Sequence, residues 1–522
     1  MRRSLIRQTM RGLPCGAALL TGLAVAAPAL AADLAPFTKA PPIVASSWTG
    51  FYAGLGLGLR ATQADLTTTL AERNGFSFDP NSAVNTQAVD GTGFRANPYA
   101  GYNWQVTPSW VFGVEGDVGF GDQATTLRGF TYGPLFGSST FNADGLSVKT
   151  TWDASLRGRA GYLLTPATLV YATGGLAWQH YDITSTCVSV VCDGATPAVV
   201  SNSTTRTGWT LGGGVETALD GNWLLRAEYR YADFGTASFS ITRATAFGLT
   251  IENFDTKLAT HTATVGLAYK FGDPGLGGRS HPLSAQAAMP SSWTGAYAGL
   301  GLGARAARTD LVATSETVGG FPFDLTERAN TRPFDNTAFR ASPYAGYLWQ
   351  FAPQWTAGIE GDFGFADSTT TRGGFTSIFL ADSQSPGESL SIRSKWDASL
   401  RARLGYLVSP QTMLYATAGV AWQNVELTST CVSVSCNGFF GVSPGIVSAS
   451  TTKAGWTVGG GLETVLWGNW LARAEYRYAD YGKASFTVAR SSTNPDFNPS
   501  INTWDVAMRT HLATFGVTYR FE

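Results

Sequence analysis

The stretch WDASLRGRAGYLL, from Trp152 to Leu164, alternates apolar and polar side chains. Aromatic, aliphatic and small residues occupy the even-numbered positions, whereas Asp153, Arg157 and Arg159 occupy odd-numbered ones. A period of two residues is typical of a β-strand, because successive side chains of a strand point to opposite faces. The stretch therefore predicts a strand with one apolar face and one charged face.

This stretch occurs twice. It returns as WDASLRARLGYLV from Trp396, and SSWTGFYAGLGLGLR at Ser46 likewise returns as SSWTGAYAGLGLGAR at Ser291. The offset of about 245 residues is far longer than the 20–50 residues of a solenoid repeat. The chain is therefore expected to contain a duplicated domain.

The first 31 residues have the features of a secretory signal peptide. Four arginines precede an apolar segment, and Ala29-Leu30-Ala31 supplies a cleavage site of small residues. The predicted organisation is a signal peptide, a spacer, two barrel repeats and a linker between them, over residues 1–31 (signal peptide), 32–45 (spacer), 46–271 (first repeat), 272–290 (linker) and 291–522 (second repeat).

The composition is rich in glycine and aromatic residues and poor in charge. The chain has 61 glycines, 16 tryptophans, 19 tyrosines and 30 phenylalanines, but only 14% charged residues, against about 25% in soluble domains. The net charge is −1 and no basic tract is present, so a nucleic-acid partner is not expected. Aromatic strands with little charge favour a surface that faces something other than water.

Short and long connections alternate between the expected strands. In the first copy the strands are predicted near 49–62, 92–106, 109–122, 149–164, 168–183, 205–219, 222–236 and 259–271. Tight turns such as Thr107-Pro108 alternate with long Ser/Thr/Asn-rich connections, predicted at 63–91, 123–148, 184–204 and 237–258. Short turns at one end and long loops at the other are typical of an outer-membrane barrel.

The fold class expected from these features is all-β, a transmembrane antiparallel up-and-down β-barrel. Each copy supplies eight strands, and a barrel must close because a free sheet edge in lipid leaves backbone groups unpaired. Two tandem eight-strand barrels are preferred, because each copy keeps a complete strand set and its own inward charges. One sixteen-strand barrel, which would enclose a water-filled channel, is the alternative.

An eight-strand barrel is narrow enough for side chains to fill it, so the charged faces are expected to meet inside. Buried carboxylates and guanidiniums are tolerated when they are paired. We interpret the set as a structural plug of salt bridges, with a gate or proton path as the alternative. Its members are Glu115, Asp117, Asp153, Arg157, Arg159, Glu216, Arg226, Glu228 and Arg230, and in the second copy Glu360, Asp362, Asp397, Arg401, Arg403, Glu463, Arg473, Glu475 and Arg477.

Several motifs together resemble a known family. WTGFYAG, PYAGYNWQ, GVEGDVGF, WDASLRGRAGYL and YATGGLAW are similar to segments of the small outer-membrane β-barrel proteins of alphaproteobacteria. These proteins, described as porin-family or immunogenic outer-membrane proteins, share an OmpA-like eight-strand barrel. The resemblance implies the outer membrane of a Gram-negative bacterium and exposed loops, with adhesion or haemin binding in some members. It does not imply a catalytic site.

The resemblance also implies a barrel-assembly signal at the C-terminus, for which Tyr519 and Phe521 have the expected spacing. Two features depart from the family. Members usually have one barrel, and here Glu522 follows the terminal aromatic residue. The expected partners are outer-membrane lipid and lipopolysaccharide, the barrel-assembly machinery, and a host or surface ligand at the loops.

Cysteine and histidine offer few further sites. Cys187 with Cys192, and Cys431 with Cys436, are each expected to form a disulfide in an oxidising compartment. His261 and His511 occupy equivalent positions and are expected at the membrane rim, with haem or metal ligation as the alternative. No nucleophile motif is present, so neither enzyme activity nor a cofactor is expected.

The function expected from the sequence is structural: barrels that display surface loops, contribute to envelope integrity and support adhesion. A diffusion porin for small solutes and loop-based capture of haemin or another ligand are the alternatives.

Overall fold

The computed structural model describes residues 47–79, 86–128, 143–188, 194–219, 222–245, 248–272, 292–318, 320–325, 331–373, 388–431, 445–491 and 499–521. The regular elements in these ranges are β-strands, and none of the described residues forms a helix suited to crossing a bilayer. The predicted signal peptide, spacer and most of the linker lie outside these ranges.

The first copy forms one antiparallel sheet of eight long and two short strands. The long strands are β1 (Gly50–Arg73), β4 (Gly91–Gln105), β5 (Trp110–Arg128), β6 (Gly145–Thr165), β7 (Thr168–Thr186), β8 (Val199–Ala218), β9 (Trp223–Thr245) and β10 (Gly248–Lys270). The short strands β2 (Phe76–Phe78) and β3 (Thr86–Ala88) both pair with β1.

The second copy repeats this sheet. Its long strands are β11 (Gly295–Val318), β14 (Asn336–Ala352), β15 (Trp355–Gly373), β16 (Ser389–Ser409), β17 (Thr412–Cys431), β18 (Gly445–Trp467), β19 (Trp470–Arg490) and β20 (Ser500–Arg520). The short strands β12 (Phe321–Pro322) and β13 (Thr331–Pro333) pair with β11.

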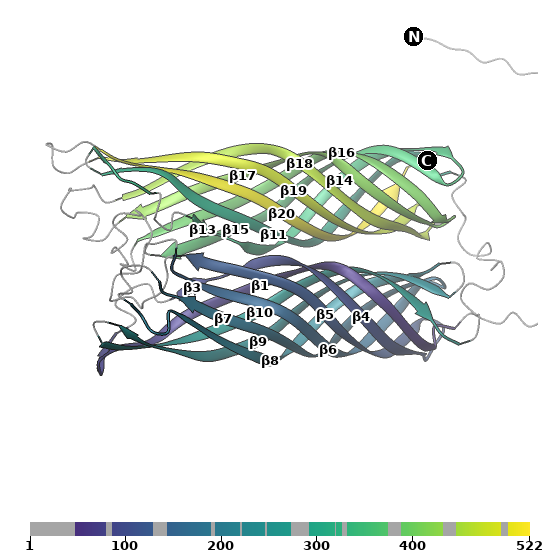
Figure 1. The fold of residues 1–522 in the computed structure, drawn as a ribbon. Coiled ribbons are helices and arrows are strands. Elements are labelled where there is room, and N and C mark those ends of the chain that lie inside the picture. Colours follow the sequence, from purple (N-terminus) through teal and green to yellow (C-terminus); the bar gives the residue numbers. More distant parts are fainter. Residues whose placement is uncertain are drawn as a thin grey trace, which may run out of the picture. The chain divides into compact units, whose positions relative to one another are not determined.

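Each sheet closes on itself. Tyr52 of β1 is paired with Gly101 of β4 on one side and with Lys270 of β10 on the other. In the second copy Tyr297 of β11 lies in the same way between β14 and β20. Figure 1 shows both sheets as closed barrels, the first in purple to teal and the second in green to yellow. The two-barrel prediction is confirmed and the sixteen-strand alternative is wrong, because the first and last strands of each copy pair with one another.

The strands are longer than the sequence pattern predicted. β9 continues to Thr245 and β10 begins at Gly248, so most of the connection predicted at 237–258 is a paired hairpin. β1 likewise extends eleven residues beyond the predicted end at Thr62. These extensions are rich in serine and threonine, a composition that is common in loops. Their β-branched threonines and their inward apolar residues nevertheless suit a strand.

An apolar band surrounds the part of each barrel next to the short turns, such as the turn between β4 and β5. We call this end the lower part and the end with the long connections the upper part. On β5 the outward side chains from Trp110 to Phe120 are exposed, with the half-buried Gly116 among them, and the inward residues, including Glu115 and Asp117, are buried. The ten-residue step from Trp110 to Phe120 covers about 26 Å at about 3.4 Å per residue and a tilt of about 40°. That height matches the apolar band of an outer-membrane barrel, about 25 Å.

Above this band the pattern inverts. Beyond Phe120, polar residues such as Asp122 point outward, whereas Leu127 of β5 and Val148 of β6 are buried inside. The β5–β6 register shifts at the boundary, between Phe120 and Gln123, and the β15–β16 register shifts at the equivalent place. On β5 the even-numbered residues remain the outward ones across the shift, so there the inversion comes from the type of residue. On β6 the register shift changes which residues point inward, because Asp153 is buried on one side of it and Thr150 on the other.

Candidate functional site

The charged lumen of each barrel is the candidate site, and Glu115 lies at its centre in the first barrel. Its carboxylate accepts hydrogen bonds from the hydroxyl of Tyr52 at 2.7 Å, from Arg157 at 2.5 Å and from Arg226 at 2.8 Å. Arg157 also donates to Glu228 at 2.8 Å. Each of these groups is buried, so the charges neutralise one another in an interior where an unpaired charge is costly.

A second group of charges lies next to the first, farther from the short turns, and includes Asp117, two residues after Glu115 on β5. Asp117 accepts from Arg95 at 2.6 Å and from Arg230 at 2.7 Å. Asp153 accepts from Arg60 at 2.8 Å and also from Arg95. Arg157 lies 3.6 Å from Asp117 and thereby links this group to the one around Glu115.

The second barrel repeats the network. Glu360 accepts from Tyr297 at 2.8 Å and from Arg473 at 2.6 Å, and also from Arg401. Asp362 accepts from Arg340 and Arg477, each at 2.6 Å. All the lumen residues predicted from the sequence lie inside their own barrel and take part in this network.

Four arginines of the network were missed by the sequence analysis: Arg60, Arg95, Arg305 and Arg340. Each is at most 2% exposed and pairs with Asp153 or Asp397. The signal was available, because both copies keep an arginine shortly after the GLGLG motif and another in FRANPYAGY and FRASPYAGY. The other lumen charges were predicted from several charged residues that alternate along one strand. These arginines have no charged residue close by, so the same pattern did not mark them.

Tyrosine rings complete the packing around the arginines. The guanidinium of Arg159 lies 4.0 Å from the ring centre of Tyr171, and that of Arg226 lies 4.0 Å from Tyr99. In the second barrel Arg403 lies 3.9 Å from Tyr415. Such cation–π contacts add to the ion pairs where water is excluded.

The lower end of each lumen is covered by the tryptophan of the SSWTG motif. The indole nitrogen of Trp48 donates to the carbonyl of Pro166 in the β6–β7 turn at 3.0 Å, and its backbone nitrogen donates to Gln105 at 2.9 Å. Trp293 makes the equivalent bonds, to Pro410 at 3.2 Å and to Gln350 at 2.8 Å. Both tryptophans are buried, so the residues just before the first strand form a floor under the charges.

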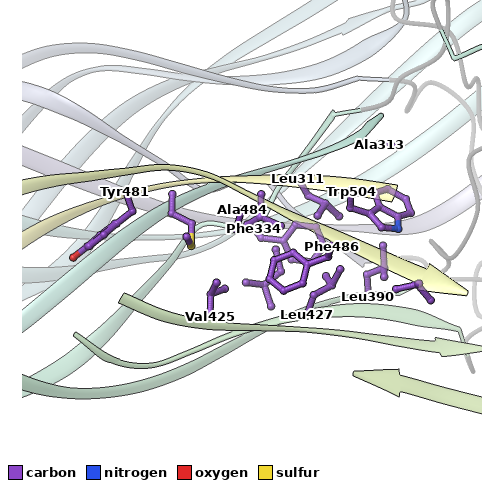
Figure 2. Packing of buried hydrophobic residues seen from close by; sticks show 14 of the residues in the cluster. Leu311, Ala313, Phe334, Leu390, Val425, Leu427, Tyr481, Ala484, Phe486 and Trp504 are labelled. Atoms are coloured by element: carbon purple, nitrogen blue, oxygen red, sulfur yellow. The ribbon is translucent and has the colours of Figure 1, made fainter. Parts of the chain in front are cut away.

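Apolar side chains fill the upper end. In the second barrel, Leu311, Phe334, Leu390, Val425 and Trp504 belong to one buried cluster (Figure 2). A corresponding cluster in the first barrel includes residues of β1, β6, β7, β9 and β10. The charged groups thus lie between a tryptophan floor and an apolar roof.

The other predicted residues have different surroundings. Cys187 and Cys431 are buried, but Cys192 and Cys436 lie outside the described residues, so both disulfides stay predictions. Tyr519 and Phe521 are in ring contact, with centres 5.2 Å apart, and their role in assembly stays a prediction.

The two histidines point away from the lumen. His261 and the hydroxyl of Tyr229 share a hydrogen bond of 2.7 Å, and His511 and Tyr476 share one of 2.8 Å. Among the residues that the structure describes, no group of three His, Cys, Asp or Glu side chains is placed to hold a metal ion.

Known proteins are similar to this chain over about half of its length. The 31 kDa outer-membrane immunogenic protein of Brucella melitensis is 30% identical over 261 residues, which cover 49% of this chain and 96% of that protein. The 25 kDa outer-membrane immunogenic protein of Brucella abortus is 32% identical over 257 residues, or 49% of this chain and 95% of that protein.

Among solved structures, the Ail protein of Yersinia pestis aligns with 44% of this chain and 99% of its own length. Its sequence identity is 18% and the TM-score is 0.21.

The family described as outer membrane protein beta-barrel domain matches residues 15–271 and again residues 282–521. Two closed barrels with apolar outer bands agree with this double match. The chain therefore belongs to the outer membrane beta-barrel protein family, as a tandem pair of its domains in the outer membrane of a Gram-negative bacterium.

Proposed function

We propose that this protein is a structural component of the outer membrane, whose two filled barrels anchor surface loops and contribute to envelope integrity. The observation that carries the proposal is the filling of each lumen from end to end. A floor tryptophan, a paired charge network and an apolar cluster occupy successive levels of the same barrel. A filled barrel suits anchoring better than passage of solutes.

The extensions above the apolar band support a role in display. From Phe120 to Arg128, β5 rises about 20 Å beyond the band at about 3.4 Å per residue and a tilt of about 40°. Long loops of outer-membrane barrels lie on the outer side, and loops on rigid scaffolds commonly carry binding. Two relatives are named immunogenic outer-membrane proteins, which is consistent with exposed loops and with adhesion to a host or surface ligand.

A diffusion porin is less well supported. In the first barrel a solute would have to pass the ion pairs around Glu115 and Asp117 and then the packed cluster above them. Haemin capture by His261 is also not favoured, because Nδ1 of that ring already shares a hydrogen bond with Tyr229. Lipopolysaccharide and the barrel-assembly machinery remain proposed partners.

The test combines an electrical and a cellular measurement. The full-length protein, refolded and inserted into planar lipid bilayers, is expected to give little or no steady conductance. A strain that lacks the gene is expected to become more sensitive to detergent and to take up more of a hydrophobic dye, and the wild-type gene should reverse both changes. Large, stable conductance steps would replace the structural proposal with a porin, and an unchanged barrier in the deletion strain would contradict it.

Adhesion needs its own comparison. Residues 129–144 connect β5 to β6, and residues 374–388 connect β15 to β16. In the test variant, short Gly/Ser segments replace residues 129–142 and 374–387. The variant is expected to restore the detergent barrier but not the attachment of cells to host surfaces. Equal attachment by the variant and the wild-type protein would remove these connections from the adhesive role.

A further inference from the structure

Two arginines stand opposite each other on the outside of the second barrel. Arg308 of β11 is the register partner of Arg509 of β20, and both alternate along their strands with buried residues. Like charges directly opposite one another destabilise a sheet. Arg509 has a counter-charge in Asp480, 3.5 Å away, whereas Arg308 forms no hydrogen bond or ion pair with the residues that the structure describes. The pair therefore destabilises the barrel by itself and needs another explanation.

A histidine donor lies beside this pair. Nδ1 of His511 shares a hydrogen bond of 2.8 Å with the hydroxyl of Tyr476. In the first barrel the other ring nitrogen of the equivalent His261, Nε2, lies 3.3 Å from Oε1 of Gln63, which is an acceptor, so we assign the ring proton to Nε2. Arg308 takes the place of Gln63 in the second barrel, and a guanidinium has donors only. In the same tautomer, the N–H of His511 thus lies beside two arginines rather than beside an acceptor.

The carboxylates around this place are common to both copies, but the basic residues are not. Four positions are acidic in each copy: Asp310, Asp335, Asp480 and Asp505, equivalent to Asp65, Asp90, Asp233 and Asp255. Three positions are basic in the second copy alone: Arg308, Lys483 and Arg509, equivalent to Gln63, Thr236 and Ala259. One position is basic in the first copy alone, Lys257, equivalent to Ala507. The second barrel thus has three basic side chains here where the first has one, against the same four carboxylates.

Most of these carboxylates have partners of their own. Three accept a hydrogen bond: Asp335 from the backbone nitrogen of Thr309 at 2.9 Å, Asp480 from that of Gly482 at 2.8 Å, and Asp505 from the hydroxyl of Ser485 at 2.6 Å. Asp310 lies two residues beyond Arg308 on β11 and so farther from the apolar band. Within the described residues, none of the four supplies the counter-charge that Arg308 lacks.

The donors lie at the upper edge of the apolar band. Tyr478 of β19 is the register partner of His511, and the exposed Trp456 lies on the next strand, β18. Below them, the outward residues of β20 from Ala513 to Val517 are apolar. Aromatic side chains mark the level of the lipid headgroups in outer-membrane barrels, and the long connections lie on the outer side. The donors are therefore at the depth of the phosphates of outer-leaflet lipids.

We propose that Arg308, Arg509 and His511 bind a phosphate group of an anionic outer-leaflet lipid, the lipid A part of lipopolysaccharide, and that the first barrel lacks this site. Lipopolysaccharide is a partner in the proposed function, and this inference, which rests on that function, gives the partner a place on the protein. Two guanidiniums can hold one phosphate through charge-assisted hydrogen bonds. The bound phosphate also offsets the repulsion between the two arginines, which explains why the pair is tolerated.

Native mass spectrometry of the full-length protein with lipid A measures this binding directly. The refolded protein is titrated with bisphosphorylated lipid A and compared with the double variant Arg308→Gln, Arg509→Ala, which has the residues of the first copy. The variant is expected to bind about tenfold more weakly, because charge-assisted hydrogen bonds are lost. Lipid A without phosphates is expected to bind both proteins alike and weakly. Equal affinities of the two proteins, or of the two forms of lipid A for the wild-type protein, would overturn the proposal.

The reciprocal double variant, Gln63→Arg with Ala259→Arg, places the same pair on the first barrel and is expected to add a second lipid A site. Heat-modifiable gel migration checks that both double variants fold. Inorganic phosphate at the concentration of the lipid is not expected to compete, because the acyl chains also contribute to binding. Competition by equimolar phosphate would mean that the donors bind a free ion, and it would overturn the lipid assignment. The measurement uses purified protein, so its failure is distinct from an unchanged barrier in the deletion strain.

Discussion

The lower and upper parts of each barrel are built from the same strands but have opposite interiors. Between Trp110 and Phe120 the outside is apolar and the inside is charged, whereas beyond Phe120 the outside is largely polar and a cluster of apolar side chains that includes Leu127 lies inside. The difference follows from what surrounds the wall. Lipid requires apolar side chains outside, so the alternating polar positions must point inward, and water removes that requirement.

The two parts of each barrel are filled in different ways. In the lower part the fill is stable because each buried charge meets several opposite charges, as around Glu115. In the upper part the fill is an ordinary hydrophobic core, of which Ile241 and Phe239 are members. A change in the lower part should therefore act through unpaired charge, and a change in the upper part through lost packing.

The largest effect is expected from Glu115→Gln. The side chain keeps its size, but Arg157 and Arg226 lose their shared counter-charge, so the free energy of unfolding of the first barrel should fall by about 3–5 kcal/mol. Urea unfolding of the full chain in lipid vesicles, followed by tryptophan fluorescence, measures this loss. Glu360→Gln is the matched change in the second barrel. If Glu115→Gln unfolds at the wild-type urea concentration, the network does not stabilise the barrel.

A smaller effect is expected from Ile241→Val in the upper cluster. Ile241 is 1% exposed, and the equivalent residue of the second barrel is already a valine, Val488. Removing one buried methylene group should cost about 0.5–1.5 kcal/mol. The same urea experiment measures it, with Val488→Ile as the reciprocal control. A loss as large as that of Glu115→Gln would remove the distinction between the two parts.

A still smaller effect is expected from Asp122→Ala, on the outside of the upper part. Asp122 lies 3.1 Å from Lys149, but both side chains are largely exposed to water. Exposed ion pairs contribute about 0–1 kcal/mol and are weakened by salt. The urea midpoint of the variant should lie close to that of the wild-type protein. A shift like that of Glu115→Gln would mean that this pair is shielded from water in the folded protein.

The smallest effect is expected when the second copy is removed altogether. Because β1 and β10 close the first barrel, residues 46–271 should refold alone in detergent and keep the same unfolding midpoint. Heat-modifiable gel migration shows whether the barrel has closed. Failure of this half to fold, under conditions in which the full chain folds, would mean that the copies depend on one another.

The sequence predicted the lower part of the barrel better than the upper part. Strict alternation with aromatic ends, as from Trp152 to Tyr162, identified the strands and their inward charges. The upper part was predicted as loops, since its outward serines and threonines are common in turns and its inward apolar residues are shifted by bulges. The partners of Arg60 and Arg95 could not be predicted, because they come from strands that are distant in the sequence.

The sequence by itself determined the duplication, the strand alternation and the outward apolar band, because these depend on the order of neighbouring residues. Tertiary structure decided how each barrel closes, how far its strands extend and which arginines share which carboxylates. Those features depend on pairings between residues that lie far apart in the chain. The alternation of side chains along one strand does not show which residues of a neighbouring strand it pairs with.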